Sequence, residues 1–159
     1  MLATVPAGNA IRASAVLLFG RPLPSHGAQH EFTIIARDRE HPVMQGLPIE
    51  WLHAKDELYH GQRGPAQDMH ILATAFSAKD KGGTGTNEPL VWTIPYGKGR
   101  VFTVLLGHVS GPNAEAIRCV GFQTVVARGT EWAATGKVTL PVPADFPGDE
   151  EKLSAPDGK

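Results

Sequence analysis

Short apolar runs separated by turn residues dominate the middle of the chain. Residues 31–37 and 69–76 are rich in β-branched and other apolar side chains, which predicts two strands. Residues 89–95 and 100–106 have the same character and flank a short connection that contains two glycines. Because such a connection is typical of a hairpin, we expect these two strands to be antiparallel neighbours.

The hydrophobic period becomes helical after residue 113, and the apolar positions that share a face are Ala116, Ile117, Val120, Phe122, Val125, Val126 and Trp132. This pattern predicts one long helix over residues 113–134, broken near Gly129. Two prolines enclose a short turn at residues 41–48, and the loop at residues 77–88 is polar and rich in glycine.

Length and composition predict one main domain. A chain of 159 residues with 42% hydrophobic residues suits a single core. We place this domain at residues 1–140 and a polar surface tail at residues 141–159, where prolines and charges replace the apolar pattern. The first thirty residues lack the strongly apolar strand and ligand-binding turn with which an open α/β sheet normally starts.

Charge and cysteine content narrow the classes of partner. The chain has 15 Lys plus Arg against 16 Asp plus Glu and no basic run, which excludes a nucleic-acid footprint. The apolar run at residues 15–19 is far shorter than the roughly 20 residues of a membrane helix, so we expect a soluble chain without a membrane partner. The single cysteine, Cys119, excludes an internal disulfide and leaves the compartment open. Its apolar neighbours predict a small, buried helix residue.

Candidate chemistry is concentrated at residues 53–60, His-Ala-Lys-Asp-Glu-Leu-Tyr-His, and at His108. If residues 56–60 are extended, Glu57 and Tyr59 lie on one face and Asp56 lies on the other. His108 follows an apolar strand and a glycine, where open α/β sheets place ligand groups. Each residue also has a plain structural interpretation: His108 suits a helix cap or a bond to a carbonyl, and Asp56 suits a turn or solvent.

Five motifs occur in a characteristic order: His-Pro-Val-Met-Gln-Gly-Leu at 41–47, Asp-Glu-Leu-Tyr at 56–59, Pro-Leu-Val-Trp at 89–92, Tyr-Gly-Lys-Gly-Arg-Val at 96–101 and Leu-Gly-His at 106–108. Together they resemble the ThuA-like (trehalose-utilisation) domain, over residues 25–134. The resemblance implies a flavodoxin-like three-layer α/β sandwich, similar to class I glutamine amidotransferases. Members of this family carry a preceding half, so we expect this chain to lack the amino-terminal part of the fold. The strand edge exposed in this way favours a homo-oligomer.

The resemblance also implies a role in the metabolism of trehalose and related keto-disaccharides, with a small-molecule carbohydrate as the partner. For acid/base transfer at a carbonyl or hydroxyl, we expect His108 and Glu57 to be catalytic. We expect Trp51 to stack on a sugar ring from a loop, and the full set of expected substrate contacts is His26, Trp51, Asp56 and Tyr59. Glutamine hydrolysis is disfavoured, because Cys119 does not lie on a strand-to-helix elbow. No cofactor follows from the sequence.

Two other functions fit the same residues. A non-catalytic binding or interaction module would keep the amidotransferase-like scaffold without its nucleophile, since fold does not imply function. A metal-dependent hydrolase would use His26, Glu57 and His108 as ligands. We assign no metal site, because the chain lacks two histidines at the tight spacing that identifies one. Whether the protein is an enzyme depends on which of these functions holds.

Overall fold

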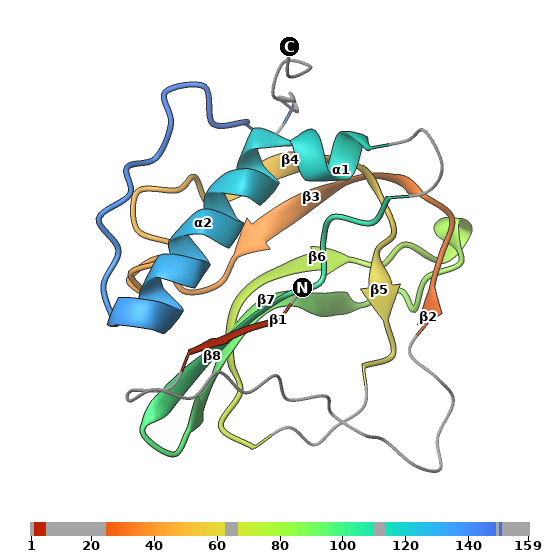
Figure 1. Cartoon of the computed structure of the whole chain (residues 1–159). Helices are drawn as coiled ribbons and strands as arrows, with labels where there is room; N and C mark the ends of the chain where they lie inside the picture. The colour runs from red at the N-terminus through yellow and green to blue at the C-terminus, as the bar shows by residue number, and fades with distance from the viewer. Residues whose placement is uncertain (1, 6–24, 63–66, 110–113, 149, 151–159) are drawn as a thin grey trace.

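A curled antiparallel sheet with two helices on one face forms the part of the chain described by the computed structural model, residues 2–5, 25–62, 67–109, 114–148 and 150 (Figure 1). Across the sheet, the strands are β1 (Leu2–Val5), β8 (Gly99–Val104), β7 (Asn87–Tyr96), β6 (His70–Phe76), β3 (His30–Ala36) and β4 (Glu50–Asp56). A separate two-stranded ribbon pairs β2 (Ser25–His26) with β5 (Tyr59–His60). The strands predicted near residues 31–37 and 69–76 are confirmed as β3 and β6.

The predicted hairpin is also confirmed. Strands β7 and β8 are antiparallel, and their pairing closes at Tyr96 and Gly99. Gly97 lies in the turn with φ of +57°, a left-handed conformation that glycine adopts without strain. The hairpin therefore follows directly from the local sequence.

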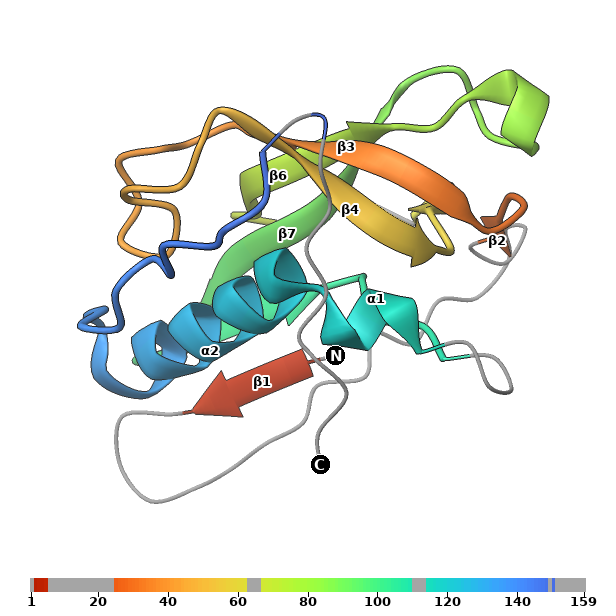
Figure 2. The ribbon, with the colours of Figure 1, turned by 90° about the horizontal axis from the view of Figure 1, so that it is seen from above.

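The helical region contains two helices, α1 (Glu115–Arg118) and α2 (Val120–Thr135), with a 3₁₀ turn, η1 (Lys79–Lys81), elsewhere in the chain. Figures 1 and 2 show both helices on the same face of the sheet. Helix α2 contacts β8, β1 and β4, so the sheet curls around it. The predicted break near Gly129 is wrong: the break falls at Cys119, whose backbone is extended with φ of −62° and ψ of 124°.

Gly129 instead permits close packing between α2 and the sheet. A Cβ atom at this position would lie 2.2 Å from the Phe102 ring, closer than any real contact. Phe102 is 1% exposed and belongs to the main hydrophobic core. The glycine therefore marks the point where the helix backbone approaches the core. In the sequence alone, the same glycine resembles a helix breaker.

The α/β class is confirmed, but the flavodoxin-like three-layer arrangement is not seen in the described residues. Every strand pairing among them is antiparallel, and α1 and α2 cover one face. Antiparallel neighbours need only short connections, whereas parallel strands need crossovers that place helices on the sheet faces. No described helix is long and apolar enough to cross a membrane.

The segment after α2 is part of the fold as far as residue 148. Val142 and Phe146 pack against the core, and the Phe146 ring lies 5.4 Å from that of Trp51. The Leu52 N–H donates to the carbonyl of Gly148 at 2.7 Å, which covers part of the β4 edge. The interpretation of residues 141–159 as a polar surface tail is therefore wrong for residues 141–148. The remainder falls almost wholly outside the described residues.

Arg128 of helix α2 forms hydrogen bonds with the segment after the helix and with the turn at residues 41–48. Its guanidinium donates to four carbonyl oxygens, those of Pro42 at 2.9 Å, Val43 at 2.9 Å, Gln45 at 2.8 Å and Leu140 at 2.6 Å. The side chain is 5% exposed, and burial lowers the pKa of the guanidinium below its ordinary value. Its hydrogen bonds offset the cost of burying this charge.

We expect Arg128→Ala to lower the free energy of unfolding by at least about 3 kcal/mol, because hydrogen bonds to charged groups each contribute about 1.5–3 kcal/mol and four carbonyls lose their donor. Urea unfolding monitored by circular dichroism measures the change. Arg39→Ala is the control, since Arg39 makes a single long bond among the described residues, 3.5 Å to the Leu47 carbonyl in the same turn. Equal losses for the two variants would contradict the role given to Arg128.

Candidate functional site

The buried carboxylate of Asp56, at the end of β4, joins two distant segments of the chain. Its Oδ1 accepts from the backbone N–H groups of Glu57 at 2.7 Å and His108 at 3.1 Å. Its Oδ2 accepts from the Gly107 N–H at 2.7 Å and lies 2.9 Å from Nε2 of His53. Asp56 is 1% exposed, so these contacts replace its hydration. Glu57 and His108 are thereby fixed next to each other.

Gly107 allows the chain to turn immediately before His108. Its φ is +91°, and a Cβ atom there would lie 2.6 Å from the Phe122 ring. Any other residue would be strained and would collide with helix α2. The glycine in the Leu-Gly-His motif thus sets the position from which the His108 side chain projects.

Glu57 is the centre of a polar cluster. Its Oε2 lies 3.2 Å from the Tyr59 hydroxyl, which donates to it, and 3.2 Å from Nδ1 of His108. Nε2 of His26 lies 3.5 Å from the same oxygen, and Oε1 accepts a long bond from Gln29 at 3.4 Å. Glu57 is 7% exposed, whereas the side chains of His108 and His26 are 35% and 41% exposed. A nearly buried carboxylate therefore lies behind two accessible imidazoles.

His26 reaches this cluster from the β2–β5 ribbon, in which it pairs with Tyr59. The two rings are 5.4 Å apart. The following residues are held against the glycine-rich loop: the Ala28 N–H donates to the Lys81 carbonyl at 2.8 Å, and a Cβ atom on Gly27 would lie 2.0 Å from that oxygen. The loop predicted at residues 77–88 thus supports the strand that carries His26.

A cavity of about 230 Å³ opens beside the cluster and is lined by Tyr59, Leu105, Leu106, Gly107 and His108. It presents one apolar wall, a phenol and an imidazole. Glu57 contacts the His108 ring through Nδ1. A carboxylate at Nδ1 favours a proton on that nitrogen, which leaves Nε2 to accept or donate a proton toward a ligand.

Tyr59 lines this cavity and donates a hydrogen bond to Glu57. Burial and the neighbouring Glu57 carboxylate together raise the pKa of the Tyr59 phenol above its ordinary value of 10.0. Both effects disfavour a phenolate. Tyr59 is therefore a neutral hydrogen-bond donor at neutral pH.

Four of the six predicted site residues are brought together: His26, Glu57, Tyr59 and His108. Trp51 is not among them. It lies in β4 rather than in a loop, is 1% exposed, and packs against Phe146, so it offers no face to a sugar. The prediction that Trp51 is a sugar platform is wrong, because the inward side of an extended strand carries it into the core.

Asp56 was predicted to contact substrate, and its burial argues against this. Its carboxylate is occupied by protein donors beneath the cluster. The predicted division of faces is consistent with this arrangement, since Glu57 and Tyr59 share the open side and Asp56 points away from it. Asp56 supports the site from below.

Two participants were missed by the sequence analysis, His53 and Gln29. His53 is fully buried and contacts Asp56, although its sequence neighbourhood only marked it as one of several histidines. A signal was present, because Trp51 and His53 are two residues apart in an extended segment and therefore lie on the same side of it. For Gln29, nothing in the sequence distinguishes it from a loop residue.

Within the described ranges, no group of three or more His, Cys, Asp and Glu side chains has an arrangement that could hold a metal ion. The predicted ligands His26 and His108 do approach Glu57, but they converge on one of its oxygens. The described geometry thus gives no support to a metal-dependent hydrolase.

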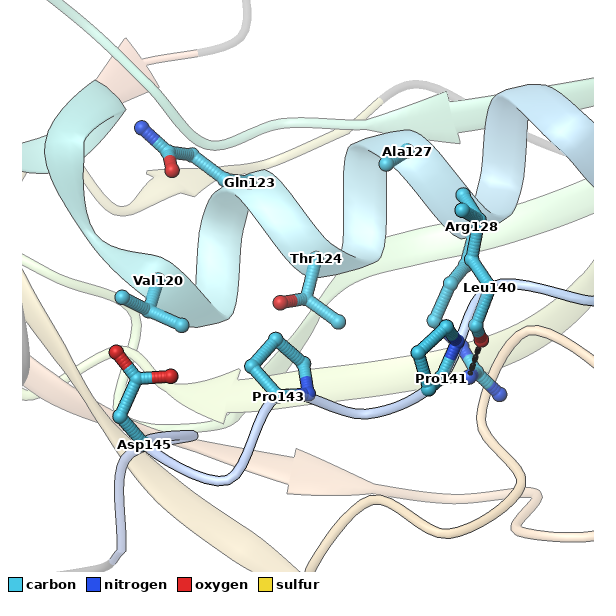
Figure 3. A pocket seen from close by; sticks show the side chains of 9 residues that line it. All are labelled: Val120, Gln123, Thr124, Ala127, Arg128, Leu140, Pro141, Pro143 and Asp145. Carbon is cyan, nitrogen blue, oxygen red and sulfur yellow. Dashed lines mark hydrogen bonds between the residues drawn. The ribbon is translucent and has the colours of Figure 1, made fainter. Parts of the chain in front are cut away.

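A larger cavity, of about 400 Å³, lies between α2 and the segment that follows it (Figure 3). Its walls are mainly apolar and include Val120, Leu140 and two prolines. Arg128 lies at its edge, but its guanidinium already donates to backbone carbonyls, one of them that of Leu140. Gln123, Thr124 and Asp145 also line the cavity. The Glu57 cluster is the better candidate site, because its polar side chains contact one carboxylate.

Comparisons with known proteins agree with the motifs. The family model ThuA, described as trehalose utilisation, matches residues 11–133. The crystal structure of a ThuA-like protein from Parabacteroides merdae ATCC 43184 is 50% identical, with a TM-score of 0.79, over 84% of this chain and 49% of that chain. The chain thus spans about half the length of this structural neighbour. No curated protein matches.

We expect Glu57→Gln to lower the pKa of Tyr59 while leaving it above 10.0, because the carboxylate contribution disappears and burial remains. Tyrosinate absorbance measured against pH reports the midpoint. The titration is best made in a Tyr96→Phe background, since the chain has 2 tyrosines and Tyr96 is 61% exposed. An unchanged midpoint would show that Glu57 does not face the phenol.

Proposed function

Because the chain belongs to the ThuA (trehalose utilisation) family, we propose that it binds a carbohydrate at the Glu57 cluster and acts in the utilisation of trehalose or a related keto-disaccharide. The observation that carries the proposal is the convergence of His26, Tyr59 and His108 on Glu57 beside a cavity. Hydroxyl-rich ligands need both donors and acceptors, and this cluster offers a phenol, two imidazoles and a carboxylate.

The size of the cavity sets how much of a disaccharide it can take. Its volume of about 230 Å³ is below the roughly 300–1,000 Å³ typical of pockets for drug-sized ligands. We infer that one sugar unit enters between His108 and Tyr59 and that the second lies outside, toward the exposed His26. The apolar wall formed by Leu105 and Leu106 would face the carbon side of the ring.

Acid/base transfer is the chemistry that this proposal assigns to the pair His108 and Glu57. Glu57 orients the imidazole through Nδ1, while Nε2 exchanges a proton with a hydroxyl or carbonyl group of the ligand. Tyr59 donates a hydrogen bond and holds the carboxylate in place. Such a positioned acid/base typically contributes about 100-fold to 10,000-fold in rate.

The flavodoxin-like three-layer sandwich belongs to the same proposal. This chain covers 49% of the structural neighbour, so strands and helices outside the matched half would have to supply the second helical layer. The activity of a longer protein would then combine the Glu57 cluster with groups from that other half. The proposed role of the cluster in this chain is carbohydrate binding, with catalysis as the step to be tested.

We expect trehalose or a 3-keto disaccharide to raise the midpoint of thermal unfolding of the 159-residue chain. A ligand at 100 times its Kd stabilises a protein by about 2.7 kcal/mol, which for this chain length is a shift of roughly 5–10 °C. His108→Ala and Glu57→Gln should each abolish most of the shift. Calorimetry measures the midpoint, and assay of disaccharide consumption measures turnover.

His70→Ala is the matched control. His70 is an exposed histidine whose Nε2 lies 2.9 Å from an Asp38 carboxylate oxygen, so it also pairs with an acid, but it lies at the start of β6, away from the cluster. Its ligand-induced shift should equal that of the unsubstituted protein. A shift without turnover would favour the non-catalytic binding module. No shift with either sugar would refute the carbohydrate proposal.

A further inference from the structure

Beneath the candidate site lies a buried polar chain, which we define as Cys119, His53 and Asp56. The His53 side chain is fully buried, and its Nε2 lies 2.9 Å from Oδ2 of Asp56. Cys119, also fully buried, lies at the junction of α1 and α2, and its thiol interacts with the His53 imidazole. Nδ1 of His53 forms no hydrogen bond of standard geometry among the described residues.

Neighbouring side chains of this group shift the pKa values of His53 and Cys119. Burial alone would lower the pKa of His53, but the Asp56 carboxylate and the Cys119 thiol outweigh it, so the pKa of His53 lies above its ordinary value of 6.5. Burial would raise the pKa of Cys119, but His53 and the backbone amides of Ala54 and Phe122 bring it below 9.0. Because a carboxylate oxygen accepts, the bond between Nε2 of His53 and Oδ2 of Asp56 places a proton on Nε2.

A buried histidine and aspartate cost stability compared with apolar residues of similar volume, so their placement calls for a reason. The Phe32 ring, 5.3 Å away, offers the imidazole no hydrogen bond, and Cys119, its other polar neighbour in this group, is fully buried at the junction of α1 and α2. Asp56 is the member of the group that contacts the segment carrying His108. The same Asp56 oxygen that faces His53 also accepts the N–H of Gly107, and the other oxygen accepts those of Glu57 and His108.

We propose that His53 is a positioning residue of the candidate site: its donated hydrogen bond holds the Asp56 carboxylate in the one orientation that fixes the Gly107–His108 backbone and keeps His108 against Glu57. This inference rests on the proposed function, because it assumes that His108 and Glu57 form the working pair. Without the His53 donor, Oδ2 of Asp56 loses one of its two partners in a buried setting. The carboxylate is then free to rotate, and the backbone of the His108 segment loosens.

Two polar substitutions separate positioning from packing. In His53→Gln, the side-chain amide nitrogen reaches about as far as Nε2 of histidine and can still donate to Asp56. In His53→Asn, the amide nitrogen is nearer to the position of Nδ1 and cannot reach. Both substitutions remove the ring and leave a polar amide in its place, so a role in packing alone predicts similar defects in both.

The test is amide hydrogen exchange followed by nuclear magnetic resonance on the ligand-free chain. We expect the Gly107 and His108 amides to be protected in the unsubstituted protein and in His53→Gln, and to exchange about tenfold faster in His53→Asn, the change that corresponds to loss of one hydrogen bond. The reference is the Arg37 amide, which donates to the Leu72 carbonyl at 2.8 Å near the opposite end of β3 and should not change. The His108 ring spectrum should show Nδ1 protonated in the first two proteins and a mixture of tautomers in His53→Asn.

Equal exchange at Gly107 and His108 in the two variants would overturn the proposal. If neither variant folds, the unsubstituted protein still decides: the His53 ring must show a slowly exchanging proton on Nε2, and an unprotonated Nε2 refutes the donated bond. These measurements need no sugar. If no sugar binds but the exchange pattern is as expected, His53 is a positioning residue for a different ligand. If a sugar binds but Gly107 and His108 exchange equally in the two variants, the site does not depend on His53.

Discussion

The carboxylate of Asp56 is the interaction on which the arrangement of the site depends. An ionised carboxylate in a protein interior is costly unless donors surround it, and here three backbone N–H groups and one imidazole do so. Two of those N–H groups come from a segment about fifty residues further along the chain. The end of β4 and the segment after β8 therefore cannot separate without leaving this charge unpaired, and the adjacency of Glu57 and His108 follows.

The contacts of Glu57 are longer than those of Asp56, and the residues that make them are more exposed. Glu57 is nearly buried, yet its partners His108 and His26 lie 3.2 and 3.5 Å away and are accessible. His26 belongs to the β2–β5 ribbon, which forms no ladder with the six-stranded sheet but contacts β7 and is bonded to the loop around Lys81. The cluster thus joins a firmly fixed carboxylate and imidazole to a second imidazole on a separate element.

The sequence predicted what depends on local pattern. Strands β3 and β6 and the β7–β8 hairpin follow from apolar runs and turn residues. Glu57 and Tyr59 contact each other, although residues 57–58 lie between β4 and β5. The sequence failed where a distant contact decides. Gly129 resembles a helix breaker until the Phe102 ring is seen against it, and Cys119 ends α1 in a contact region with β4 that no periodicity reveals. Trp51 was wrongly predicted to lie in an exposed loop, because the buried residues His53 and Asp56 are polar and β4 therefore lacks the apolar pattern of a buried strand.

Asp56 and Glu57, the first two residues of the motif Asp-Glu-Leu-Tyr, have contacts beyond those of a simple turn. Two adjacent carboxylates of this short segment have different surroundings: that of Asp56 binds backbone N–H groups, and that of Glu57 contacts His108. An apolar residue in place of Asp56 would pack at lower cost but would release the backbone that carries His108. The buried polar chain that extends from Asp56 through His53 to Cys119 is best understood in the same way, as stability given up for a defined geometry at the surface above it.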